Sequence, residues 1–215
     1  MALVVRATAR PAVARGALKP RMSAQAAVGF RVKSGWATAV LLVGPARAPR
    51  VADRRVIELS DPAVPTSRQP YHAVMGAAPA RGAKLERRLR GVVARITRRS
   101  VRRLLREYRR IGHAVRRVAL VVGSDIDPAR ITNDHIRAHA LEGRLFRTAL
   151  EGACRSCGLR ASVLIERRAY PDGATALRRS EAQVKRAVTQ LGRAIDGPWR
   201  ADEKTAALAA WMTLR

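Results

Sequence analysis

A long amphipathic helix pattern constrains this chain more than any other feature. From Lys84 to Arg110, apolar residues recur at intervals of three and four, which places them on one stripe of a helix. That stripe must face a core, while the opposite side of the helix faces solvent. The apolar positions are Leu85, Leu89, Val92, Val93, Ile96, Val101, Leu104, Leu105, Tyr108 and Ile111.

Arginine fills almost all of the remaining surface of this helix. The arginines are Arg87, Arg88, Arg90, Arg95, Arg98, Arg99, Arg102, Arg103, Arg106, Arg109 and Arg110. The acids among them are Glu86 and Glu107 alone. Because like charges three and four residues apart repel on a helix, so dense a stripe predicts a partner that carries many negative charges.

The charge of the whole chain points the same way. The net charge is +27, from 43 Lys and Arg residues against 16 Asp and Glu residues. Nucleic acid is the leading partner, because neutralised phosphates release condensed counterions. An anionic membrane surface or ribosomal RNA fits the same charge, and a solvated basic surface is the plainer interpretation. With 215 residues and an apolar fraction of 47%, the chain is not a disordered histone-like tail.

The cysteine content favours a reducing compartment. Cys154 and Cys157 leave no disulfide framework, so we expect a cytoplasmic protein. Their Cys-x-x-Cys spacing lacks the second pair of a zinc knuckle. It also falls at the carboxyl end of a predicted helix, whereas thiol redox chemistry uses the amino end. We therefore expect ordinary buried thiols. No run of the sequence reaches the ~20 apolar residues of a membrane span.

Residues 1–27 differ in composition from the rest. They contain several basic residues, two prolines, many alanines and no acid. This composition is typical of a disordered basic extension or of a targeting segment, and an organellar location follows if residues 1–21 are a transit segment. Serine is scarce, which favours a plain extension or a start at Met22. We expect residues 28–215 to form a single α/β domain.

The body of the chain predicts three consecutive strands and then alternating helices and strands. Short Val, Leu and Ile runs bounded by Gly, Ser and Pro predict the strands. The expected strands are Val28–Lys33, Trp36–Val43, Val51–Leu59, Arg117–Val122 and Arg160–Glu166. After the arginine-rich helix, the expected helices run from Asn133 or Asp134 to Cys157, over Thr175–Ile195 and over Asp202–Leu214, with Trp211 facing inward.

This order resembles that of the ribonuclease H-like superfamily, over roughly Val28–Ile195. The resemblance lies in the order of strands and helices and not in a motif. It implies an α/β fold in which a three-stranded antiparallel start is followed by βαβα. The result is a mixed five-stranded sheet with flanking helices. Enzymes of this class hold two divalent metals with carboxylates, beginning with an aspartate inside the first strand. Here that strand has no carboxylate, and Lys33 lies where an acid would be needed.

Two aspartates are the candidate catalytic residues under this resemblance. Asp125 and Asp127 follow the fourth strand, where the class often carries an acid, and with acids from elsewhere they would hold Mg²⁺. Turn and capping chemistry is the alternative role for both. The further scattered acids are Asp61, Glu86, Glu166 and Asp202.

His135 and His139 are the candidate metal ligands. They lie four residues apart on a predicted helix, with Glu142 nearby, so both imidazoles point to one side as a zinc site requires. The metalloprotease pattern would have Glu where Ile136 stands, and the sequence identifies no third ligand. The favoured interpretations are partly exposed histidines, or histidines that contact phosphate when protonated.

The long loop over Asp61–Pro79 contains four prolines and an expected helical turn at Tyr71–Met75. Long loops in compact domains are usually functional or disordered. Aromatic residues make up 4% of the chain, too few for a surface that stacks bases, which favours contacts to the nucleic-acid backbone. Tyr71 and His72, in this loop, are the exception.

We therefore expect an α/β domain that binds nucleic acid through phosphate contacts, with no catalysis and no cofactor of its own. Contacts of this kind position a protein without reading sequence. The expected contact residues are Arg31, Lys33, Arg68, Arg87, Arg88, Arg95, Arg98, Arg99, Arg102, Arg103 and Arg106. Two alternatives remain: a divergent metal-dependent nuclease or phosphotransferase, and a scaffold that binds an acidic protein partner.

Overall fold

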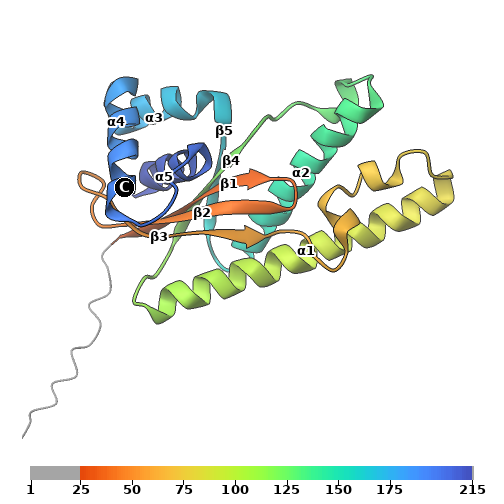
Figure 1. Cartoon of the computed structure of the whole chain (residues 1–215), viewed down its shortest axis with the longest axis horizontal. Helices are drawn as coiled ribbons and strands as arrows, with labels where there is room; N and C mark the ends of the chain where they lie inside the picture. The colour runs from red at the N-terminus through yellow and green to blue at the C-terminus, as the bar shows by residue number, and fades with distance from the viewer. Residues whose placement is uncertain (1–24, 215) are drawn as a thin grey trace, which may run out of the picture.

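The computed structural model describes residues 25–214, which contain one mixed five-stranded sheet with helices on both faces (Figure 1). The strands are β1 (Ala26–Lys33), β2 (Trp36–Val43), β3 (Arg50–Glu58), β4 (Arg117–Val122) and β5 (Arg160–Ile165). The helices are α1 (Pro79–Arg110), α2 (Asp134–Arg155), α3 (Ala169–Leu177), α4 (Glu181–Leu191) and α5 (Ala201–Thr213). Short 3-10 helices are η1 (Pro65–Arg68), η2 (His72–Val74), η3 (Pro128–Arg130), η4 (Glu166–Arg168) and η5 (Gly192–Ala194).

The strand order β3-β2-β1-β4-β5 confirms the expected topology. The first three strands are antiparallel neighbours, whereas β4 pairs parallel to β1 and β5 pairs parallel to β4. Gly35 closes the tight turn between β1 and β2 at φ +91°, a left-handed conformation that favours glycine. The parallel pairings place the carboxyl ends of β1, β4 and β5 at one edge of the sheet.

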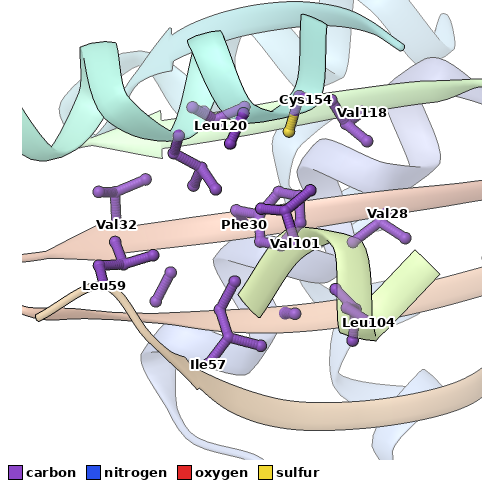
Figure 2. Close-up of a cluster of buried hydrophobic side chains, with 14 of the residues drawn as sticks. Val28, Phe30, Val32, Ile57, Leu59, Val101, Leu104, Val118, Leu120 and Cys154 are labelled. Carbon is purple, nitrogen blue, oxygen red and sulfur yellow. The ribbon is translucent and has the colours of Figure 1, made fainter. Parts of the chain in front are cut away.

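One face of the sheet packs against α1 and α2. Side chains alternate along β1, so Val28, Phe30 and Val32 enter this core. Figure 2 shows them together with Val101 of α1 and Cys154 of α2. The apolar stripe that the sequence predicted is therefore the side of α1 that faces the sheet.

The opposite face of the sheet is covered by α5, over which α3 and α4 pack (Figure 1). Contact between α5 and β1 is close, because a Cβ added to Gly29 would lie 1.8 Å from the carbonyl oxygen of Ala206. Trp211 faces inward as predicted, and its indole Nε1 donates a hydrogen bond to the carbonyl of Ala46 at 2.7 Å.

The prediction of a single helix over Thr175–Ile195 is wrong, because the chain forms two helices, α3 and α4, in this region. Arg178 ends α3 in the left-handed conformation at φ 53°. Ser180 then begins a new helix: its hydroxyl accepts from the Gln183 backbone N–H at 3.2 Å, and the Gln183 side chain accepts from the Ser180 backbone N–H at 2.9 Å. This reciprocal capping box offsets the loss of helical hydrogen bonds at the break.

Other boundaries lie close to the predicted ones. Asn133 is the cap of α2, and its side chain accepts from the Ile136 backbone N–H at 3.0 Å. The expected turn in the proline-rich loop is η2, and α1 begins earlier than expected, at Pro79. Of the basic segment expected over residues 1–27, residues 1–24 lie outside the described part, while β1 already begins at Ala26. Within residues 25–214, every helix is too short or too polar to cross a membrane.

Candidate nucleic-acid interface

The arginines of α1 form one exposed face, called here the arginine face. All the arginines between Arg87 and Arg110 are exposed. At about 100° per residue they fall, Arg90 excepted, within an arc of roughly 160° opposite the buried stripe. The helix has 32 residues and is therefore about 48 Å long. Figure 1 shows it running along one side of the molecule.

Few carboxylates neutralise this face. Glu86 accepts from Arg90 at 3.2 Å, and Glu107 accepts from Arg103 at 2.9 Å. Within residues 25–214 the other arginines of the face have no ion pair: Arg87, Arg88, Arg95, Arg98, Arg99, Arg102, Arg106, Arg109 and Arg110. The arginine face is thus a row of positive charges directed at solvent.

Polar anchors hold the carboxyl-terminal half of α1 against β3. The buried Tyr108 hydroxyl donates to an Asp53 carboxylate oxygen at 2.7 Å. Burial, together with the charge of Asp53, raises the pKa of Tyr108 well above its usual value. The Arg55 guanidinium lies 5.5 Å from the centre of the tyrosine ring and pairs with both Asp53 and Glu107. These contacts fix the helix, so the arginine face keeps one orientation.

A second basic region lies in a pocket of about 220 Å³ at the carboxyl ends of β1 and β4. Lys33, Arg144 and Arg147 line it. Arg147 pairs with Asp125, and Arg144 lies 3.4 Å from the Asp127 carboxylate. Neither arginine could be recognised from the sequence as part of a site, because nothing in α2 alone shows that they reach the edge of the sheet.

Arg31 occupies a different place from the expected one. It is buried, with 4% of its side chain exposed, and pairs with Glu166. Its Nε also lies 3.8 Å from Asp202, and Lys33 lies 3.3 Å from the same carboxylate. Arg31 therefore belongs to an internal charge cluster and not to the exposed surface, whereas Lys33 remains about one-third exposed.

The candidate catalytic acids are not brought together. Asp125 and Asp127 are exposed and face arginines, and Asp127 also accepts from the Ala129 backbone N–H at 3.2 Å as the cap of η3. Glu166 and Asp202, which the sequence gave no reason to join, meet at Arg31 instead. Within residues 25–214, no acid belongs to a group of three or more possible metal ligands.

Arg68 lies beside the turn between β1 and β2. Its side chain is exposed, and its stem packs so closely on Gly35 that a Cβ there would lie 2.7 Å from the Arg68 Cγ. This contact places the Arg68 stem at the end of β1, the strand that carries Lys33. Lys33 and Arg68 thus both lie near the turn between β1 and β2.

His135 and His139 lie on the exposed face of α2, with their Nε2 atoms 3.2 Å apart. A third imidazole, that of His72 in η2, lies beside them. The sequence showed His72 only as part of a notable loop, because 70 residues separate it from its partner Glu142 in α2.

The two cysteines lie near the end of α2. Cys154 is buried and Cys157 is half-buried, as expected. Burial raises the pKa of the Cys154 thiol to about 12, so this cysteine is unreactive at neutral pH.

Comparison with known proteins identifies solved structures with a similar fold. No protein-family model matches the sequence, and no curated protein matches it either. The structure of Thermus thermophilus RuvC in complex with a Holliday junction substrate matches with a TM-score of 0.51 and 11% identity, over 87% of this chain and 91% of that chain. The chain has the ribonuclease H-like fold. At this identity the likeness concerns the fold alone.

Weaker matches accompany this one. A second structure of Thermus thermophilus RuvC has a TM-score of 0.49 and 13% identity, over 87% of this chain and 92% of that chain. A Ppx/GppA family member from Aquifex aeolicus has a TM-score of 0.34 and 11% identity, over 71% of this chain and 40% of that chain.

Arg31, Glu166 and Asp202 form a charge cluster beside β1, the first strand of the ribonuclease H-like fold. On β1, where the resemblance to the ribonuclease H-like superfamily predicts an acid, the Arg31 guanidinium instead lies between Glu166 and Asp202. A divalent cation between Glu166 and Asp202 would meet a buried positive charge, which repels it strongly at low dielectric. In this arrangement the Arg31 guanidinium neutralises the Glu166 and Asp202 carboxylates in place of a metal ion.

Proposed function

We propose that this protein binds nucleic acid through phosphate contacts made by the arginine face of α1. The observation that carries the proposal is the row of exposed arginines on one side of a helix about 48 Å long, most of them without a carboxylate partner in the described chain. Keeping so many like charges three and four residues apart is unfavourable in the isolated protein. A polyanion removes this repulsion when it binds.

The shape of the charge favours nucleic acid over an acidic protein. Arginine presents five donors in a rigid fork that suits phosphate oxygens, and the arginine face repeats it along the whole helix. A nucleic-acid backbone offers negative charges at regular, short intervals over the same length. Contacts of this kind do not depend on sequence. The Holliday junction bound by the RuvC of similar fold is a nucleic acid too.

The pocket at the sheet edge extends this surface. Lys33 and Arg68 lie at the end of β1, and Arg144 and Arg147 approach from α2. We expect the pocket to take a phosphate of the same ligand.

We further propose that binding is not followed by metal-dependent cleavage at this edge. The guanidinium of Arg31 between Glu166 and Asp202 supports this, as do the arginine partners of Asp125 and Asp127. A nicking assay on supercoiled plasmid with Mg²⁺ or Mn²⁺ tests it. Cleavage that persists in the E166Q and D202N variants would place a nuclease elsewhere, and cleavage lost in them would restore a nuclease at this site.

Fluorescence anisotropy with labelled duplex DNA and with RNA of the same length tests the binding itself. We expect affinity to fall about 10³-fold between 50 and 200 mM salt if six or more phosphates are contacted. Salt-independent binding, or no binding at low salt, would contradict the proposal. If an acidic partner protein is pulled down with this protein and stays bound after nuclease treatment, the acidic-protein alternative is supported instead.

A further inference from the structure

Three of the four histidines of the chain meet at one point, apart from the arginine face, and one of them, His139, also lines the pocket at the sheet edge. His72 comes from η2, and His135 and His139 come from successive turns at the start of α2. One ring nitrogen from each lies within 4.8 Å of those of the other two. The ring centres are 4.3–4.8 Å apart, and the planes are tilted or perpendicular and not stacked.

A buried carboxylate stands behind these imidazoles. Glu142 is 0% exposed; its Oε1 lies 2.8 Å from the His72 Nδ1 and accepts from the His72 backbone N–H at 3.3 Å. Its Oε2 lies 3.9 Å from the His139 Nδ1 and has no hydrogen-bond partner. Both rings therefore turn their Nδ1 toward Glu142 and their Nε2 away from it. A carboxylate behind the ring is the usual support of a metal-binding histidine.

The Nε2 atoms of two of these histidines are spaced as two ligands of one metal ion would be. Those of His135 and His139 are 3.2 Å apart. Two nitrogens bound to one tetrahedral Zn²⁺ at the usual Zn–N length would be roughly 3.3 Å apart. The Nε2 of His72 is buried and has no hydrogen-bond partner in the described chain, which is rare for a polar atom. A hydrogen bond between His135 and His139 explains their short separation but leaves this third nitrogen without a role.

We propose that His72, His135 and His139 bind one Zn²⁺ through their Nε2 atoms, with Glu142 as the outer carboxylate. Imidazole nitrogens suit Zn²⁺ among the abundant divalent ions, whereas Mg²⁺ and Ca²⁺ prefer oxygen. The buried negative charge of Glu142 offsets part of the charge of the metal. Because His135 and His139 are exposed, a water molecule takes the fourth position.

The metal would also join two distant segments of the chain. The loop between β3 and α1 carries His72, and α2 carries the other ligands. The ligand atoms lie up to 4.8 Å apart, wider than a tetrahedral site, so binding draws η2 closer to α2. Zn²⁺ therefore raises the melting temperature of the folded chain.

Metal titration of the chelator-treated full chain tests the proposal. Isothermal titration with Zn²⁺ and the visible absorption of bound Co²⁺ report stoichiometry and ligand field. We expect one ion per chain. The H72Q and H139A variants should bind at least 100-fold more weakly, and E142Q about 10- to 100-fold more weakly. The matched control is H113Q, because His113 is the one histidine outside the cluster.

Three outcomes would overturn the metal site: no saturable Zn²⁺ binding by the wild-type chain, equal binding by wild type and H139A, or an equal loss in H113Q. His139 is 51% exposed, so its replacement leaves no cavity, and circular dichroism checks that the variant is folded. The metal site and the arginine face use different residues. Failure of Zn²⁺ binding therefore leaves the salt-dependent binding of nucleic acid to stand or fall on its own test.

Discussion

Removal of three charges from the middle of the arginine face is the sharpest test of the proposed binding of nucleic acid by α1. Arg95, Arg98 and Arg102 lie midway along α1 within the exposed arc and have no ion pair in the described chain. Glutamine at these positions keeps helix propensity and removes like-charge repulsion. The triple variant R95Q/R98Q/R102Q should therefore fold as well as the wild type, or slightly better.

The expected effect follows from counterion release. Each phosphate contact contributes about −0.9 to the slope of log K against log salt on duplex DNA. If all three arginines contact phosphates, the slope becomes less steep by about 2.7. With six contacts in the wild type, affinity falls about 10³-fold between 50 and 200 mM salt; with three, it falls roughly 40-fold. Anisotropy titrations at four or five salt concentrations measure both slopes.

A charge-matched control separates position from net charge. Arg167, Arg186 and Arg193 are exposed on the side of the sheet that α3, α4 and α5 cover. The variant R167Q/R186Q/R193Q loses the same three charges but leaves the arginine face intact, so its slope should equal that of the wild type. If the slope of log K against log salt decreases equally in both triple variants, binding depends on total charge. The proposed interface would then be refuted.

Further predictions concern stability, measured by urea unfolding. G29A should destabilise by about 1–3 kcal/mol, because a Cβ would lie 1.8 Å from the Ala206 carbonyl, whereas G91A, with nothing within 4 Å, should stabilise by about 1 kcal/mol. Y108F should cost about 1.5 kcal/mol through the lost hydrogen bond to Asp53. Because the pKa of Tyr108 is raised in the folded state, its contribution is complete below pH 10 and is lost above it, so Y108F should show a smaller loss of stability at alkaline pH.

The elements that follow from local pattern could be predicted from the sequence. The apolar stripe of α1 and the alternation of β1 each describe a face that must be buried, and the structure buries both. The break between α3 and α4 also had a local signal, because Ser180 and Gln183 form the spacing of a capping box. A continuous helical periodicity concealed that signal.

The contacts that give the sites their chemistry could not be predicted in this way. Arg31 alternates with Phe30 and Val32, so its side chain points to the other face of the sheet, where α5 covers it. Its partner Glu166 is 135 residues away along the chain. The charge cluster around Arg31 therefore depends on tertiary contacts that the local sequence of β1 does not contain.

The same assembly explains why the positive charge gathers on α1. The acids of the sheet edge and of α5 are engaged by internal cations: Glu166 and Asp202 by Arg31, and Asp125 by Arg147. Hydrogen bonds from Arg103 and then from Arg55 of β3 lower the pKa of Glu107, whose charge is divided between these two guanidinium groups. The fold therefore leaves the exposed side of α1 with few carboxylates, which is why we propose that an external polyanion neutralises that surface.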